Sequence, residues 1–334
     1  MRHWSYAMGV ALFLVSAQGA CAGTANPQVV VTVPALKPYA DALLAGIGQS
    51  QSLLRPGQDA HTFTLSPSQR EMLAHADVIL LPDRRMSAML DPLLDAEQKR
   101  GAAIVVLTSF KEAQALPYAK MNPWLQTAGL QGEEHHDKDD EEGPSPAPNW
   151  LDPHLWLDPI RMADLARPVA EAIADKSPGN RAMLEHNAGA LAAHLRNEVS
   201  PAVAEILAHP KPQPLKSGSR PEIPFITYHA AYQYFLKRYN LEAMGEVTQR
   251  PEDYLGARTL HDAVEGAEKI HIHCIFSETD APLVKRLAAA SDAKLVPLSP
   301  ETLYSSDEVP SVGWVRNDYD RLLEKTALEF AKCI

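Results

Sequence analysis

The chain has 334 residues, of which 46% are hydrophobic and 22% charged, a composition typical of a globular protein long enough for two domains. The net charge of −11 at pH 7 argues against nucleic acid and anionic membrane surfaces as partners. Beyond the N-terminal segment, no apolar stretch approaches the roughly 20 residues that a membrane-spanning helix needs.

The first 22 residues predict a secretory signal peptide. A weakly basic start precedes an apolar run over residues 7–17, and Ala20-Cys21-Ala22 is a small-x-small site that predicts cleavage after Ala22. One alternative is lipid attachment at Cys21, which Gln18 disfavours because an aliphatic residue is usual at that place. A buried N-terminal helix is the second alternative. Export would leave Cys274 and Cys333 in an oxidising compartment, which favours their pairing.

Strand–helix alternation begins directly after this segment. Residues 28–34 read Gln-Val-Val-Val-Thr-Val-Pro, a β-branched run of the kind that forms a buried parallel strand. Residues 39–47 and 87–100 have helical patterns, and the apolar runs 78–82 and 103–107 predict two further buried strands. This order predicts an α/β fold with a parallel sheet.

Two segments of different character separate the halves of the chain. Residues 131–149 are highly charged and then proline-rich, which predicts a mobile, acidic surface loop. Residues 178–209 have a long helical pattern, with Ser177 as N-cap, proline at the first turn and a proline-rich segment at the end. A helix of about 30 residues would span about 45 Å, enough to run along two lobes.

The second half repeats the alternation without an obvious repeat of sequence. Strands are expected at residues 223–227, 270–276 and 294–297, and helices at residues 230–239, 281–290 and 317–331. Both halves therefore predict the same kind of parallel α/β unit.

Apart from the two histidines of the acidic loop, three of the 13 histidines stand just past a strand or at a loop-to-helix junction. These are His61, His154 and His229. Because ligands in open α/β sheets gather beyond the carboxyl ends of strands, the three are candidate metal ligands. His271 and His273 form a competing pair, since they alternate along one expected strand, although a structural role is favoured for them.

The residues around these histidines resemble two signatures of the metal-binding substrate-binding proteins of ABC transporters. Asp-Ala-His61-Thr-Phe resembles the first, and Asp-Pro-His154-Leu-Trp-Leu-Asp-Pro, the more specific one, resembles the second. Further features follow in the family order. These are an acidic histidine-containing loop, a long central helix, Tyr-His229-Ala, Cys274-Ile-Phe-Ser-Glu278 and a terminal Ala-Lys-Cys333-Ile. The resemblance covers essentially the whole mature chain and is nearest to the periplasmic zinc-binding component of zinc-uptake transporters, in cluster A-I of the solute-binding proteins.

The resemblance implies two Rossmann-like lobes with parallel sheets, joined by a long rigid α-helix, with the metal in the cleft. Residues 1–22 would be the signal peptide, 23–177 the N-terminal lobe, 178–210 the connecting helix and 211–334 the C-terminal lobe. It also implies that Zn²⁺ is bound by His61, His154 and His229, and that Cys274 pairs with Cys333. The partners would be a membrane permease and a separate ATPase, because the chain has no phosphate-binding Gly-x-x-x-x-Gly-Lys-Ser/Thr motif. A monomeric binding protein, and not an enzyme, is expected.

The chain also departs from the family pattern. Leu298-Ser299-Pro300 occupies the place where related manganese-binding members carry a carboxylate ligand, so a site of three histidines is expected. Imidazole nitrogen suits Zn²⁺, whereas oxygen-rich sites suit Mn²⁺. The fourth zinc position would hold water first, or else Glu278 or Asp59, unless Glu278 instead orients a histidine ring. The acidic loop, with only His135 and His136, would be a weak accessory site.

Three other functions compete with zinc capture. Three histidines and a water also form catalytic zinc sites, although neither His-Glu-x-x-His nor Gly-x-Ser-x-Gly occurs in the chain. A binding protein of the same build could take manganese, iron or a metal chelate, and copper or nickel also accept three imidazoles. An adhesin or structural protein would contain no stoichiometric metal.

Overall fold

The computed structural model describes residues 26–55, 58, 60–119, 125, 130, 150–208, 224–250, 253, 256–303 and 316–334. The expected signal peptide, Asp59 and the acidic loop with His135 and His136 lie outside these residues. Within the described part, no helix is long and apolar enough to cross a membrane.

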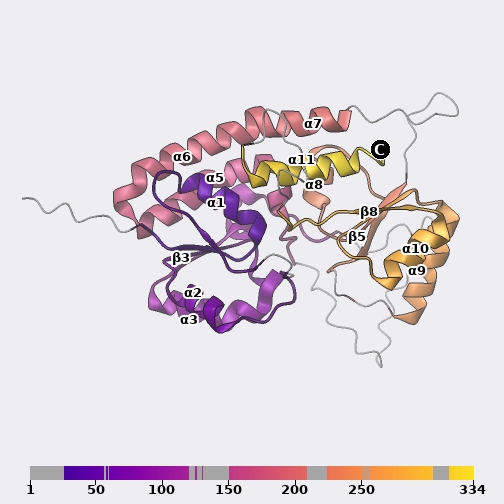
Figure 1. The fold of residues 1–334 in the computed structure, drawn as a ribbon, viewed down its shortest axis with the longest axis horizontal. Helices are drawn as coiled ribbons and strands as arrows, with labels where there is room; N and C mark the ends of the chain where they lie inside the picture. The colour runs from indigo at the N-terminus through magenta and orange to yellow at the C-terminus, as the bar shows by residue number, and fades with distance from the viewer. Residues whose placement is uncertain are drawn as a thin grey trace, which may run out of the picture.

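The N-terminal lobe is built on a parallel sheet with strand order β2-β1-β3-β4. Its strands are β1 (Val29–Val31), β2 (Gln51–Ser52), β3 (Val78–Leu81) and β4 (Ala103–Val106). Strands β1 and β3 are buried along their whole length, as expected for apolar runs covered on both faces. Helix α1 (Lys37–Leu43) covers one face, while α2 (Pro67–Ala74) and α3 (Asp91–Arg100) cover the other (Figure 1).

The C-terminal lobe repeats this topology with the parallel order β6-β5-β7-β8. Its strands are β5 (Phe225–His229), β6 (Gly245–Thr248), β7 (Cys274–Ser277) and β8 (Lys294–Pro297). Its helices are α8 (Gln233–Arg238), α9 (Ala257–Ile270) and α10 (Pro282–Ser291). In both lobes the first strand in the sequence lies between the second and the third. Because the strands of each sheet are parallel, the loops that follow them lie at one edge of that sheet.

A helical path connects the lobes and runs over both of them (Figure 1). It consists of a 3-10 turn η6 (Pro178–Asn180), helix α6 (Arg181–His194), a π turn η7 (Leu195–Val199) and helix α7 (Ser200–Ala208). Helix α5 (Pro159–Lys176) packs along α6, and the terminal helix α11 (Asp318–Phe330) packs along α7. The predicted connecting helix is therefore confirmed, with a π turn near its middle.

Short 3-10 turns complete the chain where the sequence patterns are irregular: η1 (Pro34–Leu36), η2 (Arg84–Leu90), η3 (Leu107–Ser109), η4 (Lys111–Ala113) and η5 (Leu155–Leu157). Turn η2 occupies the start of what the helical pattern over residues 87–100 predicts as one helix. Asp83 caps η2 by accepting from the main-chain N–H of Arg85 at 2.8 Å. The α-helix begins only at Asp91, followed by proline at a first-turn position that favours helix initiation.

The expected strand over residues 270–276 is wrong at its start. Helix α9 extends to Ile270, and His271 ends it in the left-handed region with a φ of 50°. His273 precedes β7, and both histidines are exposed. The sequence patterns did not predict α2, α5, α9 or the edge strands β2 and β6, because amphipathic helices and these two short strands lack continuous apolar runs.

One hydrophobic core extends through both lobes. It joins Val31 of β1 and Trp156 of η5 to Phe225 of β5 and Phe330 of α11. The predicted disulfide is present: Cys274 at the start of β7 is bonded to Cys333 just after α11, across 59 residues of sequence. It attaches the chain terminus to the C-terminal sheet.

Candidate metal centre

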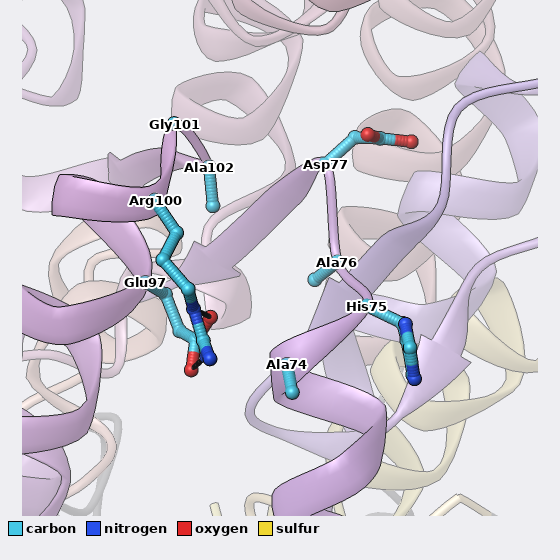
Figure 2. Close-up of a pocket in the computed structure, with 8 residues that line it drawn as sticks. All are labelled: Ala74, His75, Ala76, Asp77, Glu97, Arg100, Gly101 and Ala102. Atoms are coloured by element: carbon cyan, nitrogen blue, oxygen red, sulfur yellow. Dashed lines mark hydrogen bonds and ion pairs between the residues drawn. The ribbon is translucent and has the colours of Figure 1, made fainter.

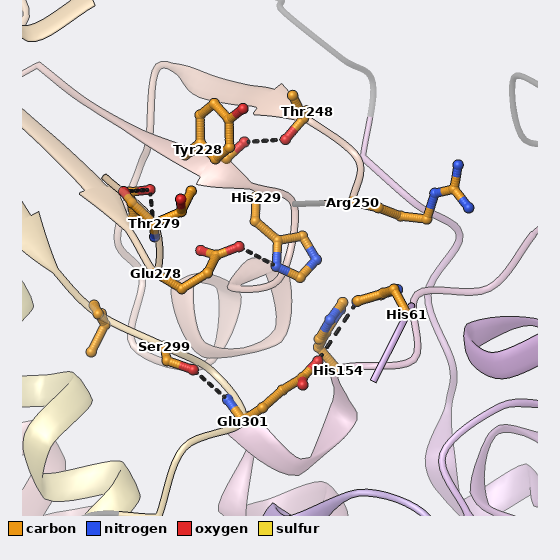
Figure 3. Close-up of polar contacts among 12 residues, drawn as sticks. His61, His154, Tyr228, His229, Thr248, Arg250, Glu278, Thr279, Ser299 and Glu301 are labelled. Atoms are coloured by element: carbon orange, nitrogen blue, oxygen red, sulfur yellow. Dashed lines mark hydrogen bonds and ion pairs between the residues drawn. The ribbon is translucent and has the colours of Figure 1, made fainter. Parts of the chain in front are cut away.

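His61, His154 and His229 converge between the lobes, although each comes from a different segment. His61 lies in the loop that precedes α2, His154 directly precedes η5, and His229 is the last residue of β5. Their exposed fractions are 5%, 0% and 1%, and one ring nitrogen of each lies within 4.8 Å of those of the other two. Figure 3 shows the three rings turned toward one another.

Asp152 fixes the orientation of the His154 ring. Its Oδ1 accepts a hydrogen bond from the main-chain N–H of His154 and lies 2.9 Å from the ring Nδ1. With the ring proton on Nδ1, the lone pair of the imidazole is on Nε2, which is buried and has no hydrogen-bond partner. Burial raises the pKa of Asp152 to about 7, and the hydrogen bonds it accepts oppose that rise. The carboxylate thus leaves His154 with a buried Nε2 that could accept a metal ion close to the other two histidines.

Glu278 has the same role for His229. It follows β7, and its Oε1 lies 3.2 Å from Nδ1 of His229, so that Nε2 is left buried and without a hydrogen-bond partner (Figure 3). Burial lowers the pKa of His229, but the charge of Glu278 and its contact with the ring outweigh burial, and the pKa lies above its ordinary value. Metal-bound histidines commonly have such a carboxylate on their second nitrogen.

His61 lies closest to a third carboxylate, Glu301, from the loop after β8. The Oε1 of Glu301 is 3.7 Å from Nε2 of His61, and its Oε2 accepts a hydrogen bond from the main-chain N–H of Ala60 at 3.3 Å. Burial lowers the pKa of His61 well below its ordinary value, and positive charge on His229, His154 and Arg250 lowers it further. The pKa of His154 is lowered in the same way, first by burial and then by His229.

Glu301 corrects the expectation that the segment Leu298-Ser299-Pro300 leaves the site without a carboxylate. The segment itself contains none, but the next residue, Glu301, lies beside His61 and accepts a hydrogen bond from Ala60 across 241 positions of sequence. Sequence reasoning also gave no role to Asp152, which stands two residues before His154 in the Asp-Pro-His stretch. Nor did it single out Arg250, whose position beside the site is visible in Figure 3.

This arrangement is costly unless something binds in it. Buried polar nitrogens without partners destabilise a fold by about 1–3 kcal/mol each, and here two Nε2 atoms share one small volume. Three imidazoles at ring-centroid distances of 4.8–5.7 Å also disfavour one another's protonation. A cation accepted by the neutral rings removes both costs. The donor set of three imidazoles and a nearby carboxylate is one that Zn²⁺ accepts tetrahedrally.

Other candidate clusters among the described residues lack these properties. His261, Asp262 and Glu265 lie on one turn of α9, where His261 is exposed and Glu265 is paired with Lys269 at 2.8 Å. A shallow hollow of about 300 Å³ lies between the ends of α2 and α3, and the charged pair beside it, Glu97 and Arg100, is self-neutralised (Figure 2). The pair His271 and His273 belongs to no metal-type cluster in the described part of the chain.

Solved structures of similar fold match most of this chain. A structure described as the SBP FpvC of P. aeruginosa in complex with Ni²⁺ matches 92% of this chain and 97% of its own, with a TM-score of 0.66 and 16% identity. A crystal structure of ZnuA matches 92% of this chain and 98% of its own, with a TM-score of 0.62 and 20% identity. At these identities the likeness establishes the fold.

The family follows from the sequence comparison. The family described as "Zinc-uptake complex component A periplasmic" matches residues 29–333, and the chain belongs to it. The High-affinity zinc uptake system protein ZnuA of Brucella abortus is 28% identical to this chain over an alignment of 340 residues. The match covers 92% of this chain and 95% of that protein. Members of this family are solute-binding proteins for transport.

Proposed function

We propose that this protein captures Zn²⁺ in the periplasm and delivers it to the permease of an ABC transporter for import. One observation carries the proposal: His61, His154 and His229 converge from three segments with buried nitrogens within 4.8 Å of one another. The names of the Brucella abortus and Haemophilus ducreyi relatives, both high-affinity zinc uptake proteins, support the same metal.

The three histidines and Glu301 are the proposed ligands. Of the two side chains that the sequence offers for the fourth position, Glu278 is engaged with Nδ1 of His229, and Asp59 lies outside the described residues. Glu301 belongs to the C-terminal lobe and approaches His61, which belongs to the N-terminal lobe. In this assignment Asp152 and Glu278 stand behind the ligands and orient their rings.

The donor set favours zinc over the alternatives. The fold alone does not select a metal, because the similar FpvC structures are described as complexes with Ni²⁺ and with Mn²⁺. Three imidazoles and one carboxylate match the preference of Zn²⁺, whereas Mn²⁺ prefers sites richer in oxygen. Four protein ligands also leave no open position for a reactive water, which separates this site from catalytic zinc centres.

Location and partners complete the proposal. Cleavage after Ala22 releases the chain into the periplasm, and retention of an acylated Cys21 in the intact mass would contradict this. The mature protein consists of an N-terminal lobe to residue 177, a connecting helix over 178–210 and a C-terminal lobe, and it works as a monomer. The metal ligands come from both lobes, so the bound ion links them, and a permease with its separate ATPase would recognise that linked form.

The test is metal analysis of the mature protein purified without chelators, followed by calorimetric titration after stripping. We expect one equivalent of zinc, and an increase of melting temperature with zinc concentration because zinc binds the folded form. Competition with Mn²⁺, Ni²⁺ and Cu²⁺ measures selectivity. A stripped protein that is folded but binds no zinc, or that prefers Mn²⁺, would overturn the proposal.

A further inference from the structure

Helix α8 of the C-terminal lobe contacts Asp152, the residue that orients the proposed ligand His154. Gln233, the first residue of α8, donates from Nε2 to Oδ2 of Asp152 at 3.1 Å and to the main-chain oxygen of Pro117 at 3.0 Å. The other oxygen of Asp152, Oδ1, is the one that holds His154. Both side chains are buried, with exposed fractions of 9% and 0%.

The orientation of the Gln233 amide follows from its three contacts. Its nitrogen faces two acceptors, whereas its oxygen accepts a hydrogen bond from Nζ of Lys237, one turn along α8, at 3.0 Å. The amide cannot be flipped without placing its oxygen against a carboxylate and a carbonyl. Asp152 is therefore held at both carboxylate oxygens, and rotation of its side chain would break a contact on one side or the other.

Gln233 lies only four residues after His229, at the start of α8. The same short segment thus supplies the third histidine and fixes the orientation of the second. A change in the position of α8 relative to the N-terminal lobe would reach His154 through Asp152.

We propose that Gln233 is a positioning residue for metal binding, which acts through Asp152 to keep Nε2 of His154 directed at the ion. The inference rests on the proposed function. Loss of outer contacts to a metal-binding histidine typically weakens binding about 10–100-fold, and for Gln233, one contact further out than Asp152, we expect about 10-fold.

The experiment measures zinc affinity, by competition with a chelator, for the mature wild type, Gln233→Leu and Gln233→Glu. The second variant keeps the size of the side chain but places a carboxylate against Asp152, and it serves if Gln233→Leu does not fold. Tyr39→Phe is the matched control, because it removes a buried hydrogen bond to the main-chain oxygen of Met162, away from the site. Circular dichroism of the metal-free proteins checks folding, and the visible spectrum of bound Co²⁺ reports ligand geometry.

We expect weaker zinc binding and an altered Co²⁺ spectrum for the Gln233 variants and neither for Tyr39→Phe. In a His154→Ala background the Gln233 substitution should have no further effect on affinity, because its route to the ion is gone. Wild-type affinity in a folded Gln233 variant, or an equal loss in the His154→Ala background, would overturn the inference. Failure of the wild type to bind zinc would instead refute the proposed function.

Discussion

Among the residues that the structure describes, two clusters of metal-type side chains differ in how they are built. His61, His154 and His229 come from distant segments, are buried, and direct unpartnered nitrogens of His154 and His229 into one volume. The cluster of His261, Asp262 and Glu265 lies on one helical turn, where His261 is exposed and Glu265 is already paired with Lys269. Proximity of the right residue types is common on surfaces, whereas buried donors without partners are rare and indicate a ligand.

The largest test of this contrast removes one histidine from each cluster. Substitution of His154 or His229 by Ala should weaken zinc binding by about two to three orders of magnitude, because it removes a direct imidazole ligand and leaves the tetrahedral site incomplete. Substitution of His261 by Ala should leave calorimetric zinc titration unchanged. Equal losses in both clusters would mean that burial does not distinguish them.

Glu301 and Glu265 provide the matching test for carboxylates. Glu301→Gln keeps the size of the side chain and removes its charge, and should weaken zinc binding about 10–100-fold if the carboxylate is the fourth ligand. Glu265→Gln is the exposed control and should have no effect. A Glu301→Gln protein that binds zinc like the wild type would restore water as the fourth ligand.

The third test concerns Glu278 and the pH dependence of zinc affinity. Zinc requires neutral His229, whose pKa lies above the ordinary value because of Glu278, so the affinity should fall as the pH drops through that raised pKa. Glu278→Gln should weaken binding about 10-fold at high pH. It should also move the onset of the acid loss to lower pH, since it removes the group that raises the pKa. An unchanged pH profile would show that Glu278 does not act on His229.

The smallest effect is expected for the acidic loop, a third group of candidate ligands. Deletion of residues 133–142 removes His135 and His136 and should leave one tight zinc per chain, with loss of only weak additional binding. Two histidines among solvated acids cannot form a closed tetrahedral site by themselves. Loss of the tight site on calorimetric titration of the deletion protein would show that the loop supplies a ligand.

Much of the fold could be predicted because local pattern and global structure agree. The runs at residues 78–82 and 103–107 are apolar and became β3 and β4; β3 is buried along its whole length, whereas β4 lies at the sheet edge and is mostly half-buried. His271 shows where this reasoning fails. Alternation with His273 indicates a strand, yet the helix α9 continues to Ile270 and ends at His271 in the left-handed conformation. A left-handed residue that is not glycine has no reliable sequence signal.

The sequence by itself determined which side chains could bind a metal, because the residues flanking His61, His154 and His229 distinguish these three from the other histidines of the chain. Only the tertiary structure decided which carboxylates accompany them. Glu301 reaches Ala60 across 241 positions and Gln233 reaches Asp152 across 81. The physical reason is that such contacts depend on how the two lobes pack against each other. Periodicity and motif spacing describe a single segment and contain no information about that packing.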